Sequence, residues 1–131
     1  MPAQPLTELS LDTLHAARQA CLTLLIDQHR IYLDSGPAVL RMLAKLRDDV
    51  GDRLGMEPLG KATPVEQRGI GEATDPELKS LERAVSTLLD RCRAAIDDPA
   101  LAEYLTGLRA SIGRERAERK AVRAGFAPQA S

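Results

Sequence analysis

Apolar residues recur at helical spacing in four segments of this chain, and this repeat constrains the fold more than any other feature. Residues 37–54 show it most clearly, since their apolar positions lie three or four residues apart: Val39, Leu43, Leu46, Val50 and Leu54. Residues at this spacing share one face of an α-helix. Each segment is therefore predicted to form a helix that buries one side.

The composition favours helices over strands. The chain has 131 residues, of which 44% are apolar. Leucine and alanine dominate, and the aromatic residues are Tyr32, Tyr104 and Phe126. Leucine and alanine are good helix formers, whereas aromatic residues are enriched in strands. We expect one all-α domain, a four-helix bundle-like arrangement of two helical hairpins joined by a linker rich in glycine and proline.

Residues 55–74 divide the helical pattern in two. Four glycines and two prolines in this stretch argue against a helix or a central strand. We therefore predict an N-terminal helical hairpin over residues 1–55 and a flexible linker over 56–74. A C-terminal helical hairpin over 75–131 follows, and it ends in a basic helix end and a tail.

The first predicted helix, residues 10–33, has a broad apolar arc, because its polar residues share a strip only about 80° wide. We expect this helix to be covered on two or more sides, by its own chain or by a second copy. The second predicted helix spans residues 37–54. It is expected to end at Gly55, since glycine suits the left-handed conformation that closes many helices.

The C-terminal hairpin opens with a capping pattern, because Thr74 and Glu77 have the spacing of a capping box. The third helix carries a seam at heptad spacing: Leu78, Leu81, Val85, Leu88, Cys92 and Ala95. The fourth helix is predicted over residues 99–124. Gly107 and Gly113 interrupt it, and we expect them to let another backbone pack closely. The seam and the broad arc together favour a homo-oligomer.

Residues 114–123 hold five basic and two acidic side chains, although the apolar stripe of the fourth helix stops at Ile112. Three interpretations stay open. The segment is a solvated helix end whose cations complement the helix dipole, a docking element that orders on a protein partner, or a nucleic-acid contact. Against the last, two glutamates interrupt the basic run and no aromatic residue is interleaved for base stacking.

The candidate partner-binding residues follow from this segment and from Phe126 just after it. Phe126 comes directly after Gly125, so it either folds back onto the last turn of the helix or anchors in a partner's pocket. The full candidate set is Arg114, Arg116, Arg119, Lys120, Arg123 and Phe126.

No residues converge in a pattern that predicts catalysis, a cofactor or a metal ion. His15 and His29 lie about 21 Å apart on one predicted helix, which is too far for one metal ion. A surface site of Glu8, Asp12 and His15 is the weak alternative. His29 falls on the apolar arc and is interpreted as a hydrogen-bonded core or interface residue. Both cysteines lie on apolar faces and are interpreted as buried thiols, with a disulfide as the alternative.

The leading hypothesis is a non-enzymatic interaction or assembly protein of the adaptor type that self-associates and uses its basic helix end. The excess of arginine over lysine is typical of a high-GC bacterial or phage gene. The alternative is a nucleic-acid-binding regulator. A net charge of −1 gives no strong field for nucleic acid or membrane. No signal peptide or apolar run of about 20 residues is seen, so we expect a cytoplasmic protein without membrane contact.

Overall fold

The computed structural model describes residues 9–32, 36–63, 65–66, 68–93, 96 and 98–125. Within these residues the chain forms helices and no strand, which confirms the predicted all-α class. In chain order the elements are α1 (Leu11–Leu25), α2 (Asp27–Arg30), α3 (Gly36–Arg53), the 3-10 helix η2 (Ile70–Glu72), α4 (Asp75–Ser86), the π-helical turn η3 (Thr87–Arg91) and α5 (Pro99–Arg123).

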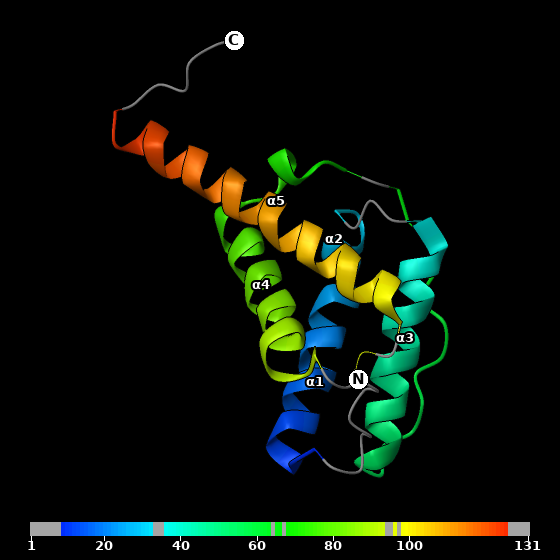
Figure 1. The fold of residues 1–131 in the computed structure, drawn as a ribbon. Coiled ribbons are helices and arrows are strands. Elements are labelled where there is room, and N and C mark those ends of the chain that lie inside the picture. Colours follow the sequence, from blue (N-terminus) through cyan, green and yellow to red (C-terminus); the bar gives the residue numbers. More distant parts are fainter. Residues whose placement is uncertain are drawn as a thin grey trace.

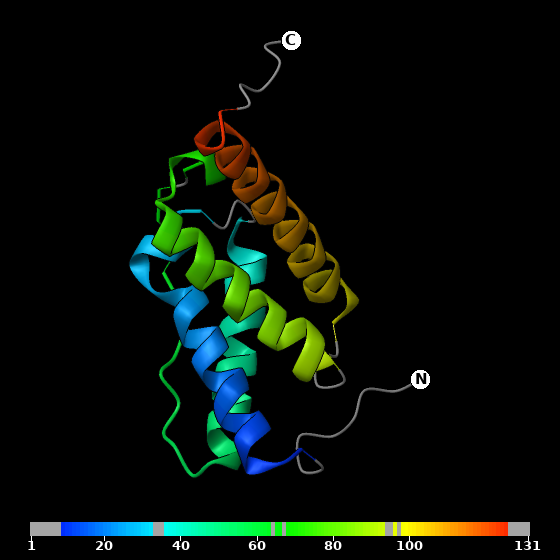
Figure 2. The ribbon, with the colours of Figure 1, turned by 90° about the vertical axis from the view of Figure 1, so that its left-hand side faces the viewer.

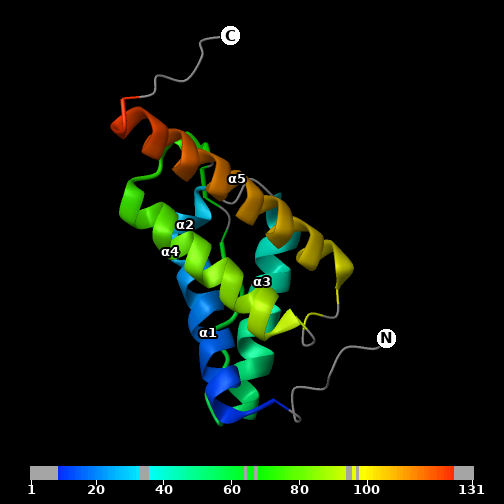
Figure 3. The same cartoon turned by 60° about the vertical axis from the view of Figure 1, so that its left-hand side comes forward.

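Helix α1 lies at the centre of this arrangement, with α3 on one side and α4 and η3 on another. Figures 1 and 3 show α1 and α3 side by side, and Figure 3 shows α4 and α5 running in opposite directions. One side of α5 packs on α4, and its other side faces away from the molecule (Figure 2). The chain's own elements thus cover most of the broad apolar arc predicted for the first helix, although Ile26 stays 44% exposed.

The core is aliphatic and continuous across these helices. Its most deeply buried side chains, besides the two cysteines, come from α1, α3, α4, η3 and α5: Leu24, Leu43, Val50, Leu78, Leu81, Val85, Leu88, Leu105 and Ile112. Each buried side chain of this size contributes about 1.5–3 kcal/mol relative to leaving it exposed. The predicted seam supplies five of the buried residues, Cys92 included, and Ala95 lies outside the described residues.

The first helix does not run unbroken to residue 33, which corrects the sequence prediction. α1 ends at Leu25, Ile26 is extended with φ −68° and ψ 150°, and α2 starts directly afterwards. The buried ring of His29 donates through Nδ1 to the carbonyl oxygen of Thr23 over 2.7 Å. In an unbroken helix that carbonyl would accept from the N–H of residue 27. The histidine therefore satisfies a helix end, and its expected hydrogen-bonded core role is confirmed.

Several helix ends use the capping residues that the sequence marks. Ser10 accepts from the N–H of Thr13 at the start of α1. The capping box of Thr74 and Glu77 begins α4 as predicted, with both hydrogen bonds formed. At the end of α3, Gly55 has φ +73°. The two hydrogen bonds of a Schellman motif form there: the Met56 N–H donates to the Gly51 carbonyl oxygen, and the Gly55 N–H donates to the Asp52 carbonyl oxygen.

An ion pair on α3 between the buried Arg47 and the partly buried Asp48 holds the segment that follows this helix. Arg47 is only 6% exposed and donates two hydrogen bonds to Asp48, from Nε to Oδ1 at 2.9 Å and from Nη2 to Oδ2 at 3.1 Å. The same carboxylate accepts the backbone N–H groups of Leu59 and Gly60 at 3.0 and 3.1 Å. Arg47 also donates to the carbonyl oxygen of Gly60. We call this arrangement the Asp48 clamp.

Two further hydrogen bonds tie the same segment to the region of α2. Arg30 donates through Nη1 to the carbonyl oxygen of Thr63 at 2.6 Å. The backbone N–H of Arg68 donates to the carbonyl oxygen of Ile31. The flexibility predicted for residues 56–74 stays a prediction, and the structure adds these points of attachment.

The glycines inside α5 do not serve the close packing expected from the sequence. A Cβ atom built on Gly107 or Gly113 would meet no atom within 4 Å, so both positions border open space. Glycine in the middle of a helix costs roughly 0.5–1 kcal/mol relative to alanine. The chain's own packing therefore gives no reason for either residue.

We predict that Asp48→Asn lowers the free energy of unfolding by about 2–4 kcal/mol, because it leaves the buried Arg47 guanidinium without its counter-charge. Urea unfolding followed by circular dichroism measures this loss. Asp49→Asn is the matched control: Asp49 is a half-exposed neighbour whose ion pair among the described residues is with the exposed Lys45, and the loss of stability in this variant should stay below about 0.5 kcal/mol. Equal losses in the two variants would contradict a special role for the clamp.

The same comparison should depend on pH. Hydrogen bonds from Arg47 lower the pKa of Asp48 from 3.8 to about 2. A lowered pKa means that the stabilising charge is present above about pH 3.8 and is lost as the pH falls toward 2. The stability gap between the native protein and Asp48→Asn should therefore narrow over this interval and stay constant above it.

We predict that Gly113→Ala raises the free energy of unfolding by about 0.5–1 kcal/mol, because the new methyl group meets open space and alanine favours the helix. Gly55→Ala, the same substitution at φ +73°, should instead lower it by about 1–2 kcal/mol. Chemical denaturation of both variants tests the pair. A destabilised Gly113→Ala would show that this face of α5 has no room.

Candidate functional site

The basic end of α5 lies against η2 and the start of α4 instead of extending alone. Arg119 donates to Asp75 at 2.9 Å and to the carbonyl oxygen of Gly71 at 3.0 Å. Arg123 reaches the other oxygen of Asp75 at 2.6 Å. Hydrogen bonds from Arg119 hold the pKa of Asp75 below its ordinary value, and the same contact raises the pKa of Arg119. One carboxylate thus forms ion pairs with two of the predicted partner-binding arginines.

The other candidates are placed differently. Arg116 forms an ion pair with Glu82 of α4. Arg114 donates to the hydroxyl of Ser111 at 3.2 Å and is the arginine of the basic end that no described carboxylate contacts. Lys120 is exposed and forms no ion pair with a described residue. Phe126 lies outside the described residues. The four arginines among the candidates therefore differ in their contacts: three form ion pairs with carboxylates, and Arg114 forms none with a described residue.

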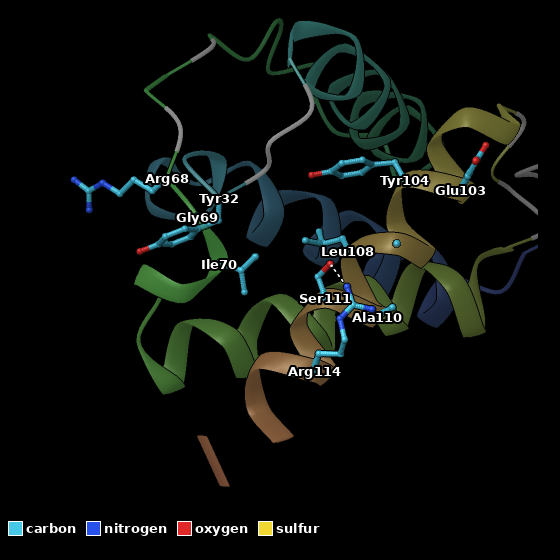
Figure 4. A pocket seen from close by; sticks show the side chains of 11 residues that line it. Tyr32, Arg68, Gly69, Ile70, Glu103, Tyr104, Leu108, Ala110, Ser111 and Arg114 are labelled. Carbon is cyan, nitrogen blue, oxygen red and sulfur yellow. Dashed lines mark hydrogen bonds between the residues drawn. The ribbon is translucent and has the colours of Figure 1, made fainter. Parts of the chain in front are cut away.

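A hollow of about 740 Å³ opens beside α5 and extends to Arg114, the first residue of the basic end. One wall is α5 itself, and the facing wall comes from Tyr32 after α2 and from the backbone that enters η2. Figure 4 shows the two tyrosines on opposite sides of the hollow. The lining residues are Tyr32, Arg68, Gly69, Ile70, Glu103, Tyr104, Gly107, Leu108, Ala110, Ser111 and Arg114.

The chemistry of this hollow is mixed. The half-buried Ile70 and Tyr104 supply apolar and aromatic surface, whereas Leu108 and Tyr32 are only 7% and 4% exposed. The Tyr32 hydroxyl faces Glu77 at 3.5 Å, at the capping box of α4. Arg114 is the sequence-predicted residue that lines the hollow. Such a surface combines the aromatic, aliphatic and arginine side chains that are enriched at protein interfaces.

Sequence reasoning missed most of the hollow because its residues come from distant parts of the chain. Tyr32 belongs to the expected first helix, Arg68 and Ile70 belong to the expected linker, and Tyr104 lies on the last helix. The one local signal was Gly107, a costly residue within a helix. Because Gly107 has no side chain, it leaves open space next to the α5 backbone where the hollow lies.

The remaining reactive side chains do not join this site. His15 is exposed on α1, and both cysteines are buried and free, as predicted. Burial raises the pKa of the Cys21 thiol to about 12, so that thiol stays neutral at physiological pH. No three of the described histidine, cysteine, aspartate and glutamate side chains converge to hold a metal ion. Glu8, part of the weak metal alternative, is outside the described residues.

Comparisons with models of protein families, with characterised proteins and with solved structures give no match to this chain. Across the described residues, no helix combines the length and apolar character that spanning a membrane requires.

We predict that Asp75→Asn speeds amide hydrogen exchange in residues 114–123, because it removes the charge that holds Arg119 and Arg123. Hydrogen exchange read by mass spectrometry on peptides of α5 measures the effect. Glu118→Gln changes an exposed carboxylate on the same helix that forms no described ion pair, and it should leave exchange unchanged. Identical exchange in the native protein and Asp75→Asn would contradict an anchoring role for this carboxylate.

Proposed function

We propose that this protein is a non-enzymatic interaction protein whose working surface is the hollow beside α5. The proposal rests on one observation. The half-buried Tyr104, an arginine that forms no ion pair with a described residue, and a helix glycine with no close neighbour line a single open surface, which the buried Tyr32 also borders. Large amphipathic side chains next to a helix position without a side chain suit a protein partner, because the partner's own side chains can fill the open space.

The bundle supports this role by presenting α5 on its outside (Figure 2). In our proposal α1 with α3, and α4 with α5, form two hairpins that the segment after α3 connects. The ion pairs of the basic end then hold α5 in place at one end of this surface. A rigid scaffold of this kind lowers the entropy that an interface must overcome on binding.

The composition of the hollow also favours binding over catalysis. Ser111 is the lining residue with an aliphatic hydroxyl, and the described hydrogen-bond partner of that hydroxyl is the Arg114 guanidinium. A guanidinium stays protonated in proteins and does not activate a nucleophile as a base. The lining residues therefore lack the paired nucleophile and base that acyl transfer requires.

Nucleic-acid binding is the alternative function, and the ion pairs of the basic end weaken its support. Arg116, Arg119 and Arg123 already contact carboxylates, so phosphate would have to displace them. Counterion release favours binding when cations are free to contact phosphates. Capture experiments with and without nuclease separate the two functions, because a protein partner survives nuclease and a nucleic-acid bridge does not.

We predict that Gly107→Arg prevents recovery of the protein partner, because the new side chain occupies the hollow and starts from a position where an added Cβ meets no atom within 4 Å. The measurement is affinity capture from host lysate after nuclease treatment, with bound proteins identified by mass spectrometry. Gly113→Arg is the matched control, since it makes the same change at another open glycine of α5 outside the hollow. If both variants capture the same proteins as the native chain, the hollow is not the working surface.

A further inference from the structure

The outward face of α5 carries a line of four residues with opposite charges at its two ends. Glu103, Gly107, Ala110 and Arg114 follow at intervals of four, three and four, so they lie on one side of the helix. All four are exposed, and all four line the hollow. We call them the α5 stripe. Figure 4 shows Glu103 and Arg114 at its opposite ends.

The charges at the ends of the α5 stripe are available to a partner. No described residue forms an ion pair with Glu103 or with Arg114, whose described contact is the neutral Ser111. The other three arginines after Ile112 are engaged by Asp75 or Glu82. About 16 Å of helix separates Glu103 from Arg114. Gly107 and Ala110 lie between them, and these small residues leave room for another helix at the middle of the stripe.

This order of residues is self-complementary about one point. The midpoint between Glu103 and Arg114 is also the midpoint between Gly107 and Ala110. A two-fold axis through that point would place Glu103 of each copy opposite Arg114 of the other. The same register sets Gly107 opposite Ala110, so the two helices can approach closely at the centre. In a two-fold interface, each such contact occurs twice.

We propose that two copies of this chain associate through antiparallel packing of their α5 stripes. This proposal rests on the proposed function and names a second copy as the partner. A parallel arrangement would set Glu103 against Glu103 and Arg114 against Arg114, which is repulsive at both ends. A uniformly acidic partner would satisfy Arg114 but would face the carboxylate of Glu103. The charge pattern therefore fits an antiparallel copy better than either.

The proposal is tested by reversing each charge alone and then mixing the variants. Arg114→Glu sets carboxylates opposite each other in its own homodimer, and Glu103→Arg does the same with guanidinium groups. We expect each variant to dimerise about 10- to 30-fold more weakly than the native chain, because two attractive contacts become repulsive. An equal mixture should recover dimers of near-native affinity, since both cross-contacts are again between opposite charges.

Sedimentation velocity over a range of concentrations measures the dimer, and circular dichroism checks that each variant is folded. Lys120→Glu is the control, because it makes a similar charge change on another side of α5 and should leave the dimer unaffected. A native chain that stays monomeric at all concentrations would overturn the proposal. So would a native dimer that both reversals leave intact, or single variants that the mixture fails to rescue.

Failure here can be told apart from failure of the proposed function. A monomeric chain that still captures a different protein, and loses it on Gly107→Arg, keeps the hollow as an interaction surface and removes only the second copy as its occupant. A chain that neither dimerises nor captures a protein through the hollow loses both proposals.

Discussion

The burial of α1 on more than one side is the constraint on which the rest of the structure depends. Its apolar arc is too broad for one neighbour, so α3 and the pair α4 and η3 must both pack against it. With those places taken, α5 packs on α4 from the outside. A helix in that position keeps one face in contact with solvent. The exposed face of α5 is therefore a consequence of how the core is filled.

Features that depend on neighbouring residues could be predicted from the sequence. The cap of Thr74 and Glu77 and the end of α3 at Gly55 each need only a few adjacent positions, and both were predicted correctly. The apolar stripes also located the buried residues of each helix, because burial follows the helical period directly. The all-α class follows from the same local signals.

Features that depend on side chains meeting across the fold were missed. The break at Ile26 lies inside an apolar run, and it arises because the ring of His29 reaches the Thr23 carbonyl oxygen. The basic end of α5 was judged by its shortage of apolar residues, whereas acids on α4 supply its contacts. The hollow brings together residues from three distant segments. Spacing along one helix contains no information on any of these encounters.

The Asp48 clamp has a consequence for the architecture of the connection between the helical pairs. One carboxylate binds backbone groups 11 and 12 residues further along the chain, and so it closes a compact ring of chain beside α3. Beyond Gly60 the backbone is outside that ring. Loop-closure entropy grows only slowly with length, so extra residues added after Lys61 would cost little. The segment after Lys61 is thus a natural place for sequence insertions. A change of length between Asp48 and Gly60 would instead break the hydrogen bonds from the Leu59 and Gly60 N–H groups to the Asp48 carboxylate.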